Sequence, residues 1–349
     1  MKTAKRVSIN WFQQEIDDPN RNWSFVEKQG NLIKFLHNRH QWYYYPKMSK
    51  VCEFPLHVDI EVSAVCDLEC PMCPRRHADV TEYTHMDIDL FRKIVDECAE
   101  YKLFSARLSW RGESLTHPHF SEFIYYIKKI AKIPNVSFLT NGRKMTEEIA
   151  ENIVEAGIDY VSFSVDGIGD VYNMIRAPLK FEMVYNSICM LKAVRDKAGK
   201  DRPQIRVSSL WPAVAQDPDE YFKVMRPLVD KIVSNPVKDY RVTAETRFKQ
   251  DYICQYPWER LFVGSDGRVQ PCSNSIERLY IGDSREETLA EIWKGKEMEK
   301  LRKAQLENRS NEYFACSRCS YKVDVNFNEQ FEKDWSGWDP GILAQPVEE

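Results

Sequence analysis

The eight residues Cys66-Asp-Leu-Glu-Cys70-Pro-Met-Cys73 carry three thiols in one short segment. They directly follow His57-Val-Asp-Ile-Glu-Val-Ser63, an alternating stretch rich in β-branched residues that predicts a strand running into a loop. Gaps of three and two residues between the cysteines allow a short loop to bring the three sulfurs to one side. Thiolates are soft ligands that suit zinc or iron–sulfur clusters.

No fourth cysteine follows this segment closely. A structural zinc ion needs a fourth protein ligand, and a cubane cluster normally takes four cysteines. The triplet therefore points to a cluster with one iron left open for a small molecule. A zinc knuckle and a chance arrangement remain as alternatives at this stage.

Composition indicates an ordinary globular chain of one large or two modest domains, with 349 residues, 43% hydrophobic and 29% charged. A formal charge of −4 and a pI of about 6.1 give no bulk electrostatic argument for binding nucleic acid or a membrane. The N-terminal segment has no apolar signal core, and no apolar run reaches transmembrane length. We therefore expect a cytoplasmic protein whose ten cysteines are reduced and free to bind metal.

From residue 57 onward, strand-like and helix-like segments alternate. Five to six successive β–α units require parallel strands with right-handed crossovers, and they put polar motifs at the C-terminal ends of the strands. This predicts an α/β fold with a partial (β/α)6 TIM-like barrel, followed by a small cysteine-rich domain. The predicted segments after the first strand are a helix capped by Asp87, strand 104–110, helix 119–131, strand 135–139, helix 145–156, strand 158–165, helix 181–196, strand 204–209, helix 217–233 and a short strand near 239–244.

The C-x3-C-x2-C loop after a first strand resembles the radical SAM superfamily. The resemblance implies that Cys66, Cys70 and Cys73 hold a catalytic [4Fe–4S] cluster whose open iron is chelated by S-adenosylmethionine (SAM). Met72 stands where family members place an aromatic residue.

The resemblance extends to the motifs at the ends of the later strands. Arg111-Gly-Glu-Ser114 takes the place of the family's Gly-Gly-Glu-Pro motif, with arginine and serine as departures. It implies that Glu113 accepts hydrogen bonds from the SAM amino group. The implied contacts to the SAM ribose and carboxylate are Asn141, Ser164, Asp166 and, more weakly, Ser208.

A second set of cysteines comprises Cys254, Cys272, Cys316 and Cys319. Ser265-Asp-Gly267 between two apolar runs predicts a hairpin that brings the first two together. A structural zinc held by four thiolates fits this spacing. The arrangement, including a helix that begins near Thr288 and continues to about 307, also resembles the SPASM and twitch extensions of radical SAM enzymes. It implies one fully ligated auxiliary [4Fe–4S] cluster, because no further cysteine follows.

These features divide the chain into an N-terminal extension (1–50), a radical SAM partial barrel (51–245), an auxiliary-cluster domain (246–324) and a C-terminal tail (325–349). Residues near the predicted strand ends supply weak candidates for substrate contacts. They are Arg176, Arg206, Trp211, Glu245, which could serve as a base, and Arg247.

The resemblance implies reductive cleavage of SAM to a 5′-deoxyadenosyl radical that takes a hydrogen atom from a substrate. Our leading hypothesis is oxidation or rearrangement of a hydroxylated small molecule such as a sugar or aminocyclitol, with the auxiliary cluster as electron acceptor. The layout is similar to that of aminocyclitol-dehydrogenase members, and a flavodoxin- or ferredoxin-type protein would supply electrons. Alternatives are radical modification of a peptide, radical epimerisation, and a zinc-binding interaction protein without catalysis.

Overall fold

The computed structural model describes residues 14–15, 24, 26–28, 31–73, 75, 84–235, 249, 252–273 and 279–322. Statements about structure below concern these residues. The expected strand near 239–244, the tail 325–349 and the predicted domain boundary at 245–246 lie outside them. The four predicted domain segments therefore stay a prediction.

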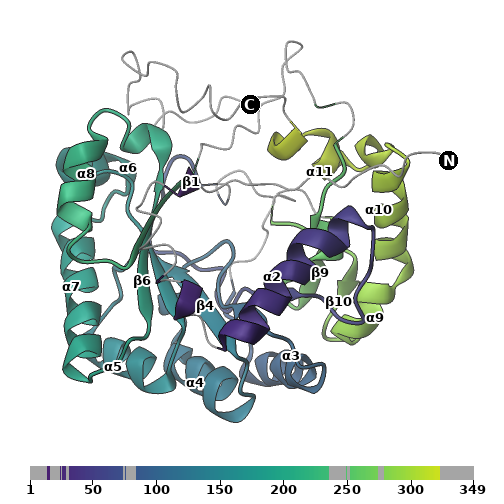
Figure 1. Ribbon diagram of the computed structural model, residues 1–349, viewed down its shortest axis with the longest axis horizontal. Coiled ribbons are helices and arrows are strands. Elements are labelled where there is room, and N and C mark those ends of the chain that lie inside the picture. The colour runs from purple at the N-terminus through teal and green to yellow at the C-terminus, as the bar shows by residue number, and fades with distance from the viewer. Residues whose placement is uncertain are drawn as a thin grey trace.

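A curved, mostly parallel sheet forms the centre of the molecule, and helices cover its outside (Figure 1). Six consecutive parallel strands make up the barrel part in the order of the sequence, which confirms the predicted α/β fold with a partial (β/α)6 barrel. They are β2 (His57–Ile60), β3 (Ser105–Arg107), β4 (Asn135–Thr140), β5 (Tyr160–Ser164), β6 (Gln204–Leu210) and β7 (Lys231–Asn235).

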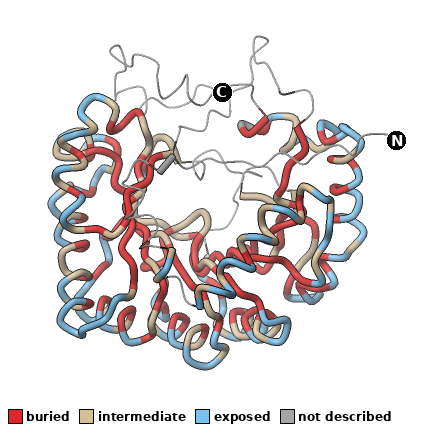
Figure 2. Tube along the Cα trace, viewed as in Figure 1, coloured by how far each residue is buried: buried red, intermediate tan, exposed pale blue. Residues whose placement is uncertain are grey.

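The two faces of this sheet differ in polarity because side chains alternate along each strand. Outward-pointing residues are apolar and pack beneath the helices, among them Val58, Ile60, Val136, Phe138, Val161 and Val207. The opposite, inner face carries polar residues, among them His57, Asp59, Ser105, Arg107, Ser137, Ser162 and Arg206. Figure 2 shows burial along the strands and exposure on the outer sides of the helices.

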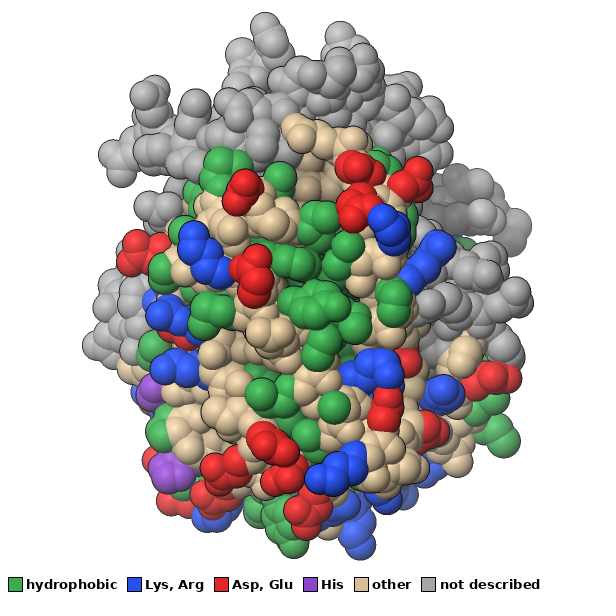
Figure 3. All heavy atoms as spheres, turned by 90° about the vertical axis from the view of Figure 1, so that its left-hand side faces the viewer, with side chains coloured by type: hydrophobic (Ala, Val, Ile, Leu, Met, Phe, Trp, Pro, Cys, Tyr) green, Lys and Arg blue, Asp and Glu red, His purple; other side chains and the backbone are tan. Residues whose placement is uncertain are grey.

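The helices that cover the sheet follow the predicted capping signals. Asp87 accepts hydrogen bonds from the first backbone N–H groups of α3, and Gly157 ends α5 with a φ of 80°. Figure 3 shows the outer side of the molecule at the left of Figure 1, where basic and acidic side chains are interspersed around apolar ones. The helices are α3 (Ile88–Glu100), α4 (Phe120–Tyr125, continued by a π-helical turn to Ile130), α5 (Glu147–Ala156), α6 (Gly169–Ile175), α7 (Phe181–Lys197) and α8 (Pro218–Met225).

Two predicted helices differ from the observed ones. The helix expected over 217–233 ends at Met225, and residues 231–235 form β7 instead. Pro227 explains the stop, since proline lacks the backbone N–H and disfavours helical geometry in the residue before it. The helix expected from Thr288 to about 307 is broken at Gly295 into α9 (Leu289–Lys294) and α10 (Lys296–Leu306).

The C-terminal region continues the same sheet. β8 (Arg260–Val263) pairs in parallel with β2, and β9 (Arg268–Gln270) and β10 (Gly282–Asp283) follow in antiparallel order. The predicted hairpin turn is present, and Gly267 adopts a φ of 84° there. At the opposite edge, β1 (Gln14–Glu15) pairs with β7. The barrel and the cysteine-rich region are thus joined through backbone hydrogen bonds.

Helix α2 (Leu32–Lys47) lies across the N-terminal ends of β2, β3 and β8. The Asn38 amide donates to the Leu56 carbonyl at 3.1 Å, just before β2. Trp42 lies edge-on to His57 with ring centroids 5.7 Å apart, and the guanidinium carbons of Arg39 and Arg260 each lie 4.4 Å from the Trp42 ring centroid. Aromatic residues of this helix therefore pack on the main domain.

Candidate functional site

The loop that carries Cys66, Cys70 and Cys73 begins at the C-terminal end of β2. The Cys73 N–H donates to the Cys70 carbonyl at 3.0 Å, which closes a turn between them. Burial raises the pKa of the Cys66 thiol to about 12 and raises that of Cys70 as well. Such thiols ionise when a metal supplies positive charge, so three buried or half-buried soft ligands on one loop fit an iron–sulfur cluster.

The segment Arg111-Gly-Glu-Ser114 holds the start of the cysteine loop. The Glu113 N–H donates to the Val65 carbonyl at 2.8 Å. A Cβ atom on Gly112 would lie 2.3 Å from the Ser63 carbonyl oxygen and 2.7 Å from that of Val65, so the close approach requires glycine. Thr116 adds a hydroxyl contact of 2.8 Å to the Ser63 hydroxyl. This motif therefore fixes residues 63–65, directly before the first thiol.

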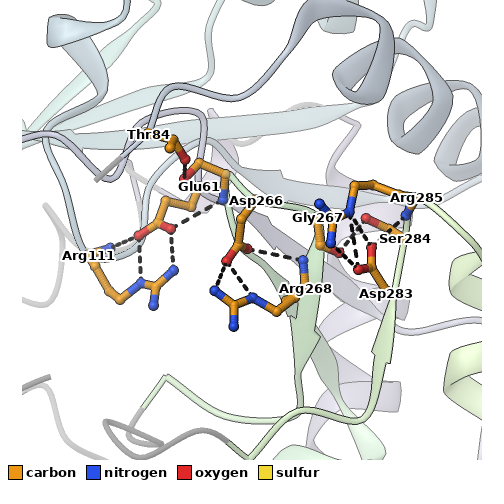
Figure 4. A network of polar contacts seen from close by, with 10 residues as sticks. Glu61, Thr84, Arg111, Asp266, Gly267, Arg268, Asp283, Ser284 and Arg285 are labelled. Atoms are coloured by element: carbon orange, nitrogen blue, oxygen red, sulfur yellow. Dashed lines mark hydrogen bonds and ion pairs between the residues drawn. The ribbon is translucent and has the colours of Figure 1, made fainter. Parts of the chain in front are cut away.

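Arg111, which departs from the family's glycine, has a structural partner. Its guanidinium makes two contacts of 2.8 and 2.5 Å with the buried carboxylate of Glu61, and its backbone N–H adds a third at 3.0 Å. The Ser265 N–H donates to the same carboxylate at 3.3 Å. Figure 4 shows Glu61 between Arg111 and the turn that joins β8 to β9. Arg111, through Glu61, thus connects the barrel to the turn of the cysteine-rich region.

The carboxylate of Glu113 is an acceptor shared by several protein groups. It accepts from the Thr140 hydroxyl at 2.8 Å, the Asn141 N–H at 2.6 Å and the Leu115 N–H at 3.1 Å. Burial raises the pKa of Glu113 to about 7. The Asn141 amide in turn donates to Asp67 of the cysteine loop at 2.8 Å. Glu113 and Asn141 therefore lie together beside the thiols, and their contact with SAM stays a prediction.

Asp166 follows β5 and is held by two neighbours. One carboxylate oxygen accepts from the Leu210 N–H at 2.6 Å, and the other accepts from the Arg176 guanidinium at 2.7 Å. Arg176 also donates to the Cys70 sulfur at 3.6 Å. Arg176, expected as a substrate contact, therefore joins Asp166 to the cysteine loop.

Of the other candidates, Ser164, Arg206 and Ser208 lie on the inner face of β5 and β6. Ser164 and Ser208 are register partners on β5 and β6, and the Ser208 hydroxyl accepts from the Asn235 amide at 2.7 Å. Arg206 lies two residues before Ser208 on the same strand. Trp211 begins the short helix after β6. Glu245 and Arg247 lie outside the described residues.

Sequence reasoning missed Asp67, Thr140 and Arg143 as parts of this site. The Arg143 guanidinium donates to the Asp67 carbonyl at 2.7 Å, and the Thr140 hydroxyl accepts from the Gly142 N–H at 2.9 Å. Thr140 stands in the Thr-Asn-Gly turn that the sequence already singles out, so its hydroxyl could have been included. Asp67 has no such local signal, because its partners come from β4 and the turn after it.

The second set of cysteines surrounds a single cavity. Its volume, open mouth included, is about 420 Å³, and its wall is otherwise mostly apolar. Burial raises the pKa of Cys254 well above its usual value, and the other three thiols, when charged, raise it further. The Gln305 amide donates to the Cys316 sulfur at 3.7 Å. The cavity is lined by Cys254, Cys272, Cys316 and Cys319, with Tyr252, Pro257, Leu279 and Leu301 among the other residues.

The four thiols around one cavity match the ligand set of a closed iron–sulfur cluster. A tetrahedral zinc ion draws its thiolate ligands to about 2.3 Å, whereas a cubane cluster occupies the space between its thiolates.

Comparison with known proteins gives one family match in each of the two cysteine-containing regions. Residues 60–202 match the profile of the radical SAM superfamily, and residues 254–320 match that of SPASM, an iron–sulfur cluster-binding domain. These domains imply a SAM-binding [4Fe–4S] cluster and auxiliary cluster binding. Among the described residues, no helix is long and apolar enough to cross a membrane.

Three curated relatives cover most of the chain. A tungsten-containing aldehyde ferredoxin oxidoreductase cofactor-modifying protein from Pyrococcus furiosus is 25% identical, covering 80% of this chain and 92% of that protein. The SAM-dependent 2-deoxy-scyllo-inosamine dehydrogenase of Niallia circulans is 22% identical, over 79% and 96%. A PqqA peptide cyclase from Granulibacter bethesdensis is 24% identical, over 70% and 75%.

The crystal structure of BtrN in complex with AdoMet and 2-DOIA shares the fold, with 17% identity and a TM-score of 0.53 over 75% of this chain and 92% of that one. The two profile matches fall on the two regions in which the cysteines gather. The chain therefore carries a radical SAM domain followed by a SPASM domain.

Proposed function

We propose that this radical SAM enzyme oxidises a hydroxylated small molecule such as a sugar or aminocyclitol. The observation that carries the proposal is the second cysteine set, in which four thiols surround one cavity. A cluster held by four thiolates has no open iron for a substrate, so electron transfer is its remaining use. The dehydrogenase from Niallia circulans, similar over most of both chains, supports this reading.

The bound groups supply the reactive chemistry: SAM on a three-cysteine [4Fe–4S] cluster gives a 5′-deoxyadenosyl radical for hydrogen abstraction, and an auxiliary cluster takes up one electron. Cys66, Cys70 and Cys73 would hold the first cluster, and Cys254, Cys272, Cys316 and Cys319 the second. The cavity of the second set has a largely apolar wall, which keeps water away from the sulfurs.

The chain's own residues orient the site. Glu113 holds the turn that contains Asn141 through hydrogen bonds of 2.6 and 2.8 Å. Arg176 places a positive charge beside the Cys70 sulfur and is itself oriented by Asp166. These contacts hold side chains in place at the mouth of the barrel, and such pre-organisation is what the positioning of a substrate requires.

The number of electrons transferred fixes the ratio of substrate oxidised to SAM cleaved in the proposed reaction. Oxidation of a secondary alcohol to a ketone removes one hydrogen atom from carbon, one proton from oxygen and one electron. Cleavage of SAM consumes one electron, which we assign to a flavodoxin- or ferredoxin-type reductant. The electron removed from the substrate goes to the auxiliary site, so substrate oxidation and SAM cleavage proceed one to one.

Radical modification of a peptide is the second candidate. The peptide cyclase relative, which covers 70% of this chain, favours it. The Pyrococcus furiosus relative, whose name describes modification of a cofactor, favours a small molecule instead. Radical epimerisation requires a thiol donor near the substrate, and Cys98 lies on the buried side of α3, in the core on the outer side of the sheet. Cys52 and Cys189 lie before β2 and on α7, outside the strand ends.

The test is an anaerobic incubation of the reconstituted protein with SAM, dithionite and a panel of sugars and aminocyclitols. We expect 5′-deoxyadenosine and a product about two mass units lighter than its substrate, in equal amounts. The protein should be brown and contain about eight irons. A colourless zinc protein would instead favour a binding module, and 5′-deoxyadenosine formed only with a peptide would favour the second candidate.

A further inference from the structure

Lys322 is a charged residue in the wall of the cavity that the second set of cysteines surrounds. It follows Cys319 by three positions, in the short helical turn Ser320–Lys322, and is only 6% exposed. Apart from the cysteines, the other described residues of this wall are apolar or uncharged. Burying a charge is unfavourable unless an opposite charge compensates it, so a lysine at this position needs a counter-charge.

The side-chain contacts of Lys322 within the described residues supply no such counter-charge. Its ammonium donates to the Ser310 hydroxyl at 2.6 Å and to the Asn311 side-chain carbonyl at 2.7 Å, and both partners are neutral. The carboxylate of Glu312, which follows Asn311 in the sequence, contacts the Arg309 guanidinium at 2.6 Å. Across the part of the chain that the structure describes, no carboxylate forms an ion pair with Lys322.

The thiols of the cavity are the groups whose charge acts on this ammonium. Burial lowers the pKa of Lys322, and negative charge on Cys316, Cys319 and Cys254 raises it. The backbone N–H of Lys322 also donates to the Cys319 carbonyl at 2.9 Å, which holds the lysine beside the two cysteines of the knuckle. The counter-charge of Lys322 is therefore the charged form of the cysteine set, and thiolates are the form that binds metal.

A second polar group of the wall contacts one of the sulfurs directly. The Gln305 amide donates to the Cys316 sulfur at 3.7 Å, and its side-chain carbonyl accepts from the Cys254 N–H at 3.2 Å. Net charge, hydrogen bonds to the sulfurs and solvent exposure are the properties by which a protein sets the reduction potential of an iron–sulfur cluster. The wall of this cavity contributes to two of them, through the Lys322 ammonium and the Gln305 amide.

We propose that Lys322 raises the reduction potential of the iron–sulfur cluster held by the second cysteine set, and so favours uptake of an electron there. The inference rests on the proposed function for the source of that electron. One electron moves from the substrate radical to the cluster, the hydroxyl proton of the substrate leaves to solvent, and no bond to Lys322 forms or breaks. The electron adds negative charge, so an ammonium in a mostly apolar wall stabilises the reduced form more than the oxidised form.

The experiment is a redox titration of the full-length reconstituted protein in which alanine replaces Cys66, Cys70 and Cys73, so that the paramagnetic resonance signal comes from the second cluster. Lys322→Gln should lower the midpoint potential, with an equilibrium constant for one-electron reduction about tenfold smaller, equivalent to about 59 mV. Lys322→Arg keeps the charge and should restore most of the potential. An unchanged potential in Lys322→Gln overturns the proposal, and so does the absence of a cluster from the second cysteine set.

Asn311→Asp tests the same charge without removing the lysine. This nearly isosteric change places a carboxylate beside the ammonium, at the atom that now accepts from it at 2.7 Å, and should also lower the midpoint potential. It decides the question if Lys322→Gln does not fold, and an unchanged potential would contradict the proposal. Lys300→Gln is the matched control, because Lys300 pairs with Glu297 on the exposed side of α10 and the potential should stay constant. An equal fall in this control would overturn the specific role of Lys322.

Product analysis with the first cysteine set intact separates this inference from the proposed function. In Lys322→Gln, 5′-deoxyadenosine should still form, but the amount of oxidised product should fall below it because electron uptake is weaker. A lowered potential in Lys322→Gln, with no oxidised product from any sugar or aminocyclitol even in the unsubstituted protein, refutes the function and leaves the role of Lys322 standing. Equal amounts of product and 5′-deoxyadenosine in Lys322→Gln, with an unchanged potential, refute the role of Lys322 and leave the function standing.

Discussion

Cys66, Cys70 and Cys73 come from one loop at the end of β2, whereas the second set is spread between residues 254 and 319. The positions of the first three cysteines depend on one backbone segment, which the loop around Gly112 holds in place. The second set depends on a hairpin, α10 and a knuckle that meet only in the folded chain. On the proposed function, three local thiols would leave one iron open, and four thiols around one cavity would close the other cluster. We therefore propose catalysis at the first site and electron transfer at the second.

Removing each set of cysteines tests this division most strongly. Replacing Cys66, Cys70 and Cys73 with alanine should reduce 5′-deoxyadenosine formation by about a thousandfold or more, since the open iron is lost. Replacing the second set should leave slow SAM cleavage but remove the oxidised product. Each variant should retain about four irons. SAM cleavage that survives without the first set contradicts the division.

The substitution Gly112→Ala affects only the first site, with Cys66, Cys70 and Cys73. The added Cβ meets backbone atoms of residues 63–65, so we expect a loss of about 3 kcal/mol in unfolding free energy and poor loading of the first cluster. Denaturation curves and iron content measure the two effects. Gly199→Ala is the control: Gly199 has a φ of 63° but open space, so only backbone strain of about 1 kcal/mol applies. Equal effects in both variants would refute the role of Gly112 in holding residues 63–65.

Glu113→Gln and Glu97→Gln form a matched pair across the two regions. Glu113 accepts backbone N–H groups beside the first cysteine loop, and Glu97 accepts those of Leu289 and Ala290 at the start of α9. An amide turns one acceptor into a donor, so each variant should lose about 2 kcal/mol. Only Glu113→Gln should weaken SAM binding, as measured by equilibrium dialysis. Weakened binding in both would show that the two regions are not separable.

A smaller expected effect is the pH dependence of stability that His57 causes in the sheet that both regions share. Burial lowers the pKa of His57 to about 4, despite the nearby Asp59. Since the unfolded chain takes up the proton first, stability should fall as pH drops from the ordinary histidine value towards 4. The expected loss is about 1 kcal/mol between about pH 6.5 and 5.5. In His57→Gln this part of the pH slope should vanish, and an unchanged slope would refute the assignment.

Local signals in the sequence predict most of the fold. Alternating β-branched residues, the caps at Asp87 and Gly157 and the hairpin turn at Gly267 all act within a few residues, and each is observed. The helix expected over 217–233 failed because an apolar run after Pro227 suits a strand as well as a helix. Parallel pairing of β8 with β2 was beyond local reasoning, because it joins residues about two hundred positions apart.

The candidate site shows the same limit. Cysteine spacing identifies both metal-binding regions, because ligand geometry constrains spacing directly. The contacts of Asn141 with Asp67, and of Arg176 with Cys70, depend on which strands are neighbours. The charge of the inner face follows from strand register, which decides that Arg107, Arg206 and Lys231 point the same way. These contacts and this shared orientation can therefore be identified only in the folded structure.

The most direct test is the electron paramagnetic resonance spectrum of the dithionite-reduced protein with and without SAM. In the variant that lacks Cys254, Cys272, Cys316 and Cys319, SAM should change the spectrum of the remaining cluster, because its open iron binds the cofactor. In the variant that lacks Cys66, Cys70 and Cys73, SAM should leave the spectrum unchanged. A change caused by SAM in the second variant, or none in the first, would contradict the assignment of open and closed clusters.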